Sequence, residues 1–123
     1  MVNGVYFIEP GTAWGPEAPS WTWDQGTDMY GTAISGAERL ENGNTLVTWG
    51  QRGTFYEVNH EGEIVWEYIN PVINDGIVVQ GESVPTTQNG QRNPVFRATR
   101  IEPTHSALSG RELMPQGYIE TSP

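Results

Sequence analysis

Apolar and polar positions alternate between residues 34 and 71 in four short runs that turn-forming residues separate. Leu46 and Thr48 alternate with Val47 and Trp49, which places successive side chains on opposite faces of a strand. Asn-Gly and Gly-x-x-Gly steps between the runs supply the positive φ angles that tight hairpins require. The pattern predicts four antiparallel strands, at residues 37–40, 45–49, 54–58 and 63–68.

Hairpin geometry makes a specific demand on two glycines in this region. Gly43 follows Asn42 in the first turn, and Gly62 follows Glu61 in the third turn. Both turns must reverse the chain within a few residues, so we expect positive φ at both glycines.

The same residues carry a resemblance to a known group of proteins. The stretch GAERLENGNTLVTWG, followed by GTFYEVNHEGEIVWEY and NPV, resembles the late blades of bacterial arylsulfotransferase-like β-propeller proteins, a group also described as having quinoprotein-like repeats. The later NPVFRATRIEPTHSALSGREL resembles the carboxy-terminal segment of that group. The likeness covers roughly residues 21–120, with an unmatched insertion at 72–93. Glu38 and Glu41 stand where the group usually has glutamine and proline.

This resemblance implies an all-β fold built of antiparallel four-stranded β-propeller-type blades. Residues 1–123 would form a single β domain, which we divide as follows: a partial blade at 4–24, a complete blade at 34–71, an insertion loop at 72–93, and a partial blade and tail at 94–120. Further strands are expected in these partial blades, at 5–9, 20–24, 94–101 and 118–120. Residues 77–79 read as either a strand or an exposed hairpin.

About two blades cannot close a propeller, which needs roughly four to eight. We therefore expect the fold to be completed by oligomerisation, either with copies of the same chain or with a separate piece that carries the missing blades. Trp23 and Trp66 occupy equivalent places in the last strands of two blades, so both are expected to be buried between blades.

Composition excludes several partners. The chain has 123 residues, no cysteine and a formal net charge of −9, which argues against nucleic acid and against anionic membrane surfaces. No apolar run approaches the length of a membrane helix, so membrane insertion is not expected. No signal peptide is recognisable in this chain, whereas the resemblance implies an extracytoplasmic location. We predict no cofactor.

Three arginines are the first candidates for ligand binding. Arg97 and Arg100 flank apolar positions in the expected strand at 94–101, and Arg39 has the matching place in the central blade. A desolvated arginine pairs with a carboxylate or binds an anion. The three side chains therefore either pair with Glu38, Glu57 or Glu102, or line an anion-binding channel.

Other candidates lie in loops. Trp14 and His105 are candidates for contact with a glycan or a small anion. Asp24 and Asp28 are weak candidates for a calcium site, since their loop lacks the further acidic ligands of a helix-loop-helix site, and turn roles explain both. Arylsulfotransferases of the resembled type use a histidine nucleophile, but neither His60 nor His105 lies in a segment that matches that motif.

Three functions remain open from the sequence. The favoured one is a non-catalytic β-propeller blade module that acts through assembly or ligand binding. The alternatives are the carboxy-terminal fragment of an arylsulfotransferase-like enzyme, inactive alone, and a carbohydrate- or anion-binding module. No catalytic residue is assigned to this chain, and we do not expect it to be an enzyme by itself.

Overall fold

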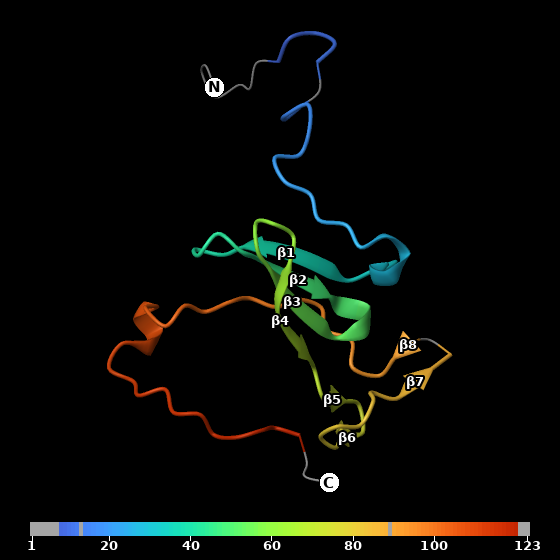
Figure 1. Cartoon of the computed structure of the whole chain (residues 1–123), viewed down its shortest axis with the longest axis vertical. Helices are drawn as coiled ribbons and strands as arrows, with labels where there is room; N and C mark the ends of the chain where they lie inside the picture. The colour runs from blue at the N-terminus through green and yellow to red at the C-terminus, as the bar shows by residue number, and fades with distance from the viewer. Residues whose placement is uncertain (1–7, 13, 89, 121–123) are drawn as a thin grey trace.

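The computed structural model describes residues 8–12, 14–88 and 90–120, and a four-stranded antiparallel sheet lies at its centre (Figure 1). The strands follow the order of the chain, so each pairs with the next one: β1 (Ser35–Arg39), β2 (Thr45–Trp49), β3 (Thr54–Val58) and β4 (Ile64–Ile69). The predicted four-stranded antiparallel sheet and the all-β character are confirmed. β2 and β3 have the predicted bounds, while β1 and β4 are each shifted by one or two residues.

The turns between these strands have the predicted geometry. Gly43 and Gly62 both adopt a φ of 87°. Between β2 and β3 the chain forms the short 3-10 helix η2 (Gly50–Arg52), which ends at Gly53 with a φ of 55°. Left-handed backbone is accessible to glycine at little cost, so these positions set the lengths of the hairpins.

The register divides the sheet into two faces. Thr48 lies opposite Phe55 and Leu46 lies opposite Glu57, while Val47 lies opposite Tyr56 between them. We call the face that carries Leu46, Phe55 and Glu57 face A, and the face that carries Val47 and Tyr56 face B. The two inner strands are largely buried, whereas the outer strands β1 and β4 are largely exposed.

Face A holds the main apolar core. Leu40, Leu46 and Phe55 are buried together, and Val95 and Ala98 pack against them from the segment that follows the sheet in sequence. The backbone N–H of Val95 donates to the carbonyl of Gly50 at 2.8 Å, which holds this segment on the sheet. Face A is therefore covered by residues that come after β4.

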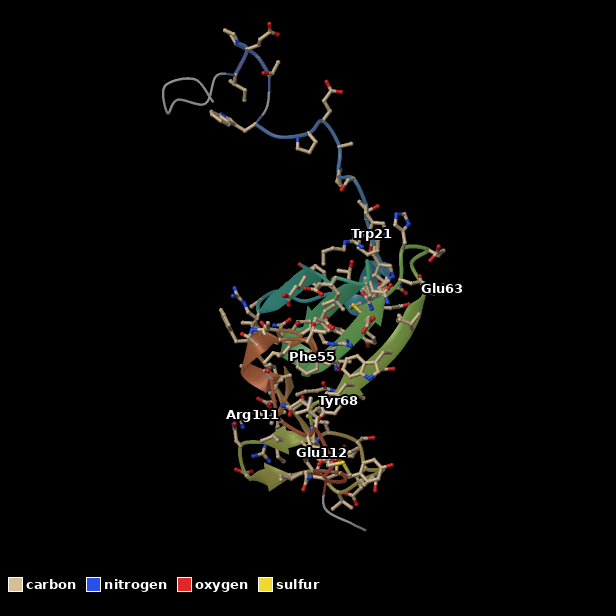
Figure 2. The ribbon with its side chains drawn as sticks, turned by 90° about the vertical axis from the view of Figure 1, so that its left-hand side faces the viewer. Trp21, Phe55, Glu63, Tyr68, Arg111 and Glu112 are labelled. Carbon is tan, nitrogen blue, oxygen red and sulfur yellow. The ribbon has the colours of Figure 1, made fainter. Side chains whose placement is uncertain are left out.

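Face B is covered by residues that come before β1. The indole N–H of Trp21 donates to the carbonyl of His60, and that of Trp23 donates to the carbonyl of Gly62, both at 3.0 Å. The ring of Trp23 lies 6.3 Å from that of Tyr56 on the sheet. Before Trp21 the described chain extends away from the sheet, as Figures 1 and 2 both show.

The remaining elements are short. Two hairpins follow the sheet, the first formed by β5 (Val72–Ile73) and β6 (Gly76–Ile77), the second by β7 (Thr86–Thr87) and β8 (Gly90–Gln91). Two further 3-10 helices are η1 (Gly26–Met29) and η3 (Ser106–Leu108). Neither reading of 77–79 holds as a whole, because Ile77 ends β6 of the first hairpin while the buried Val78 and the half-buried Val79 lie beyond it. No helix within the described ranges is long and apolar enough to span a membrane.

The strands expected in the partial blades are not formed. Residues 20–24, 94–101 and 118–120 contain no strand, so these three predictions are wrong. A strand requires a neighbouring strand that exchanges backbone hydrogen bonds with it. Of the described backbone hydrogen bonds outside the sheet, residues 94–101 form one, which Val95 donates. Residues 20–24 are instead attached through the side chains of Trp21 and Trp23. Of the strand expected at 5–9, residues 5–7 lie outside the described part.

The prediction for Trp66 also needs correction. Its side chain is 47% exposed, so it is not buried within this chain. Trp66 lies on β4, the last strand of the sheet, and the segment that covers Leu46 and Phe55 does not bury it. Trp23, its predicted counterpart, is half-buried against Tyr56.

Candidate functional site

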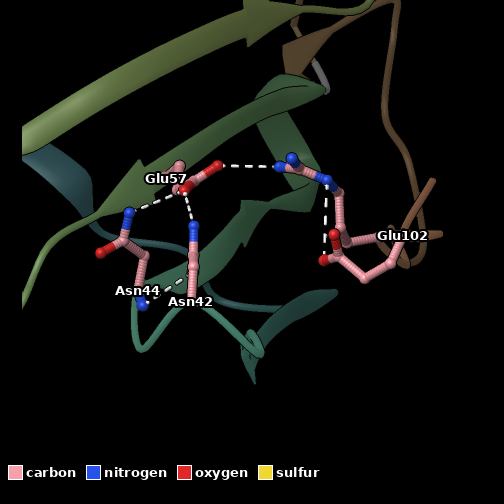
Figure 3. A network of polar contacts seen from close by, with 5 residues as sticks. Asn42, Asn44, Glu57 and Glu102 are labelled. Atoms are coloured by element: carbon pink, nitrogen blue, oxygen red, sulfur yellow. Dashed lines mark hydrogen bonds and ion pairs between the residues drawn. The ribbon is translucent and has the colours of Figure 1, made fainter. Parts of the chain in front are cut away.

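A buried carboxylate on face A forms the most connected polar cluster that the structure describes (Figure 3). Oε1 of Glu57 accepts hydrogen bonds from the side-chain amides of Asn42 at 3.0 Å and Asn44 at 2.7 Å. Oε2 accepts from Nη1 of Arg100 at 2.9 Å. Nε of Arg100 lies 4.0 Å from a carboxylate oxygen of Glu102. The cluster joins the β1–β2 turn, β3 and the segment after the sheet.

The local sequence explains how the two amides reach Glu57. The side chain of Asn42 accepts a hydrogen bond from the backbone of Asn44 at 3.0 Å, which fixes the turn. Glu57 lies on β3 next to β2, and Leu46, its partner on β2, is close to this turn in sequence. The turn therefore delivers both amide groups to one carboxylate.

These contacts stabilise the charged form of Glu57. The amide of Asn44, then that of Asn42, holds the pKa of Glu57 below its ordinary value of 4.5, and Arg100 adds to the effect. Burial acts in the opposite direction, since removal from water disfavours the carboxylate, but the hydrogen bonds outweigh it.

We expect Glu57→Gln to lower the free energy of unfolding by about 1–3 kcal/mol at neutral pH, because charge-assisted hydrogen bonds to a buried group are lost. Folding lowers the pKa of Glu57, so its ionised carboxylate contributes fully to the free energy of unfolding above about pH 4.5. This stabilisation is lost as the pH falls below that value. Urea unfolding followed by circular dichroism at a series of pH values measures the difference.

Glu41→Gln is the matched control for this experiment, since Glu41 is exposed in the β1–β2 turn. Wild type and Glu57→Gln should converge in stability on acidification, and the control should remain close to wild type at neutral pH. A stability difference between wild type and Glu57→Gln that stays constant through the acid range would contradict the assignment.

The structure places the three candidate arginines in different surroundings. Arg100 pairs with Glu57 and lies near Glu102, two of the partners that the sequence suggested. Arg39 instead donates to the carbonyl of Gly43 at 2.8 Å, and its guanidinium lies 4.8 Å from the centre of the Trp21 ring. Arg97 is exposed and forms no ion pair with a described residue; it lines a shallow groove beside β1.

A hollow of about 320 Å³ brings three sequence candidates together, namely Arg39, Arg100 and His105. Its lining also includes three carboxylates, from Glu38, Glu41 and Glu102. Nδ1 of His105 accepts a hydrogen bond from the backbone of Ala107 at 3.2 Å, so this nitrogen caps the short helix η3. Because acidic groups surround both arginines, the hollow offers an anion little net positive charge.

The other candidates stand apart from this hollow. Trp14 is 70% exposed in the segment that extends from the sheet. Asp24 accepts a hydrogen bond from the backbone of Gly26 at 2.6 Å, which is a turn role, and Asp28 lies within η1. Within the described ranges, no three histidine or acidic side chains are grouped so that they could hold a metal ion.

Sequence reasoning missed the two asparagines of the cluster. Asn42 and Asn44 flank Gly43, a pattern that by itself indicates a turn. The alternation that places Glu57 on the same face as Leu46 and Phe55 was the available clue, because a carboxylate on an apolar face requires hydrogen-bond donors nearby. The cluster as a whole fastens three segments together and contains no arrangement of nucleophile and base.

Comparison of the chain with models of protein families, with curated proteins and with solved structures gives no match.

Proposed function

We propose that this chain is a non-catalytic module of the β-propeller blade type that works by assembling with other sheets. One observation carries the proposal: the segment before the sheet lies on face B, and the segment after it lies on face A. In a propeller the blades are arranged radially, so each blade has the preceding blade on one face and the following blade on the other. The two segments lie on the two faces that such neighbours would contact, and this supports the comparison with a blade.

Incomplete cover of the sheet supports the same proposal. A groove of about 540 Å³ lies on face A between β4 and residues 98–100, with Phe55 and Glu57 among the residues that line it. Val65 and Trp66 form its β4 side, and both side chains are about half exposed. Contiguous exposed apolar side chains of this kind mark interaction surfaces. A neighbouring blade would fill the groove and cover both residues.

Copies of the same chain are the proposed partners. A head-to-tail contact between face A of one copy and face B of the next repeats without change, and it closes into a ring when the rotation permits. Each copy contributes the one four-stranded sheet that the structure describes, so roughly four to eight copies would give the number of blades that a closed propeller requires. The uncovered part of face A beside β4 would then be buried at each contact.

Size-exclusion chromatography with light scattering over a range of concentrations tests the proposal. We expect the wild-type chain to have a mass several times the 13.6 kDa of one copy. Trp66→Glu should shift the mass toward the monomer, because it places a charge in the contact. Tyr118→Glu is the matched control, since Tyr118 is an exposed aromatic residue in the tail, and its mass should equal that of wild type.

Circular dichroism of each variant shows whether it is folded before its mass is interpreted. A wild-type chain that remains a folded monomer at every concentration would contradict assembly from copies. A monomer that becomes a defined complex only with a second polypeptide would point to a separate partner that carries the other blades.

A further inference from the structure

The outer edge of β4 is an unpaired strand edge. β4 is last in the sheet order, and within the described ranges its backbone is paired with β3 alone. A strand at the edge of a sheet presents a row of N–H and C=O groups that another strand can pair with. This edge is distinct from faces A and B, which the proposed assembly uses.

The two edges of the sheet differ in how well they suit strand addition. β1 contains Gly36 and two charged residues, and residues 97–99 line a groove together with it. β4 has no glycine, proline or basic residue, and Glu67 is its one charged residue. Proteins protect edge strands with lysine, proline, bulges or covering segments. β4 has one of these features, a register shift beside Val58, and its pairing from Trp66 to Ile69 is regular.

Apolar side chains border the β4 edge on both sides of the sheet. Trp66 shares face A with Glu57, whereas Ile64 and Ile69 share the opposite face with Val58 and Thr54. The exposed fractions of Ile64, Val65, Trp66 and Ile69 lie between 45% and 53%. A strand added here would bury apolar area on both faces in addition to forming backbone hydrogen bonds.

The charges along this edge indicate the chemistry of the added strand. Glu61 and Glu63 lie in the turn before β4, and Glu67 lies within it, whereas the turn and the strand contain no lysine or arginine and His60 is their one histidine. An antiparallel pair of β4 strands from two copies would bring the two Glu67 carboxylates toward one another near the middle of the strand, and each copy already has a net charge of −9. A strand with basic residues at its ends has complementary charge instead.

We propose that the outer edge of β4 binds, by antiparallel strand addition, an extended segment of another polypeptide with alternating apolar residues and basic residues at its ends. The backbone supplies the hydrogen bonds, the exposed side chains of β4 supply apolar contact, and the glutamates select the basic ends. The site shares the side chains of Val65 and Trp66 with the face-A groove, but its backbone hydrogen bonds are not used by the face-to-face assembly proposed above.

The test uses the full chain and a fluorescent synthetic peptide of alternating valine and threonine with arginine at both ends. Fluorescence anisotropy measures affinity, and hydrogen exchange shows which backbone amides become protected. We expect the peptide to bind and to protect amides within Ile64–Ile69. A peptide with proline at its centre should bind at least roughly tenfold more weakly, because proline removes a ladder hydrogen bond and disfavours the extended pairing.

Glu67→Gln and Glu41→Gln separate the site from general attraction to an acidic protein. Both variants remove one negative charge, but Glu67 lies on β4 and Glu41 lies in the β1–β2 turn. Glu67→Gln should weaken binding of the arginine peptide by roughly two- to fivefold, the range for one exposed ion pair, and Glu41→Gln should leave it nearly unchanged. A peptide with glutamate at both ends should bind more weakly than the arginine peptide.

Three results would overturn the proposal. The first is equal binding of the proline peptide, which would mean that charge alone attracts the peptides. The second is protection by the peptide of amides outside β4 only. The third is protection of Ile64–Ile69 that grows with protein concentration in the absence of peptide, which would make a second copy the occupant. Light scattering on the same samples reports face-to-face assembly separately, so failure of either proposal is recognised independently.

Discussion

Gly53→Ala is expected to lower the free energy of unfolding by roughly 3–5 kcal/mol or to prevent folding. A Cβ atom at Gly53 would lie 2.1 Å from the backbone oxygen of Asn93 and 2.7 Å from its side-chain nitrogen. Asn93 cannot yield easily, because it is buried and its side chain donates to the carbonyl of Asn70 at 2.8 Å. Asn70 in turn donates its backbone N–H to Gly53 at 2.8 Å.

Gly43→Ala is the matched control for this substitution. Gly43 also has a positive φ, but a Cβ atom there would meet nothing within 4 Å. The control therefore measures backbone strain alone, which costs about 1 kcal/mol. Urea unfolding of both variants separates the cost of backbone strain from the cost of the clash with Asn93. Equal losses at both positions would show that the contact between Gly53 and Asn93 contributes nothing.

Phe55→Ala is expected to lower the free energy of unfolding by about 3–5 kcal/mol, the range for removing a buried large aromatic side chain. Phe55 is 8% exposed, packs with Leu40 and Leu46, and stacks on Tyr68 with ring centres 6.1 Å apart (Figure 2). The segment over face A is held by hydrogen bonds at Val95 and Arg100, which opposes its collapse into the resulting cavity.

Trp66→Ala provides the comparison, since Trp66 is also aromatic and also lies on face A. It is half exposed, so its removal should cost less, about 1–2 kcal/mol at low protein concentration. If copies assemble through face A, the cost should grow with concentration, while that of Phe55→Ala should not. A larger loss for Trp66→Ala than for Phe55→Ala in the monomer would reverse the assignment of the core.

The sequence was sufficient to predict the four-stranded sheet because its signals are local. Alternation along β2 and β3 and glycines at the hairpin turns are properties of adjacent residues, and each agrees with the others. The start of β1 was less well predicted, because Ser35 and Gly36 carry neither an apolar pattern nor strand propensity.

The strand expected at residues 94–101 shows where local pattern is insufficient. Its residues alternate, but a strand also needs an edge with which to pair, and pairing is decided by distant parts of the chain. In the structure Val95 donates to Gly50 and Arg100 pairs with Glu57, so the segment crosses face A instead of joining an edge.

The charged partners of the arginines were predictable from the sequence only in part. Glu57 and Glu102 were among the expected partners of the arginines, because a desolvated guanidinium requires a carboxylate. The contacts of the Asn42 and Asn44 amides with Glu57 could not be predicted, since a turn alone explains both residues: the backbone N–H of Asn44 donates to the side-chain oxygen of Asn42. A turn asparagine can stabilise its own turn or donate to a side chain on a neighbouring strand. The outcome depends on which side chain the following strands place beside it.

The approach of the chain along face B and its departure along face A have a genetic consequence. A unit that is entered from one side and left from the other can be repeated in tandem without reversing its direction. Duplication of the coding sequence in frame would therefore lengthen the structure by whole units. Two coding units joined in this way should yield a covalent dimer whose sheets meet face to face.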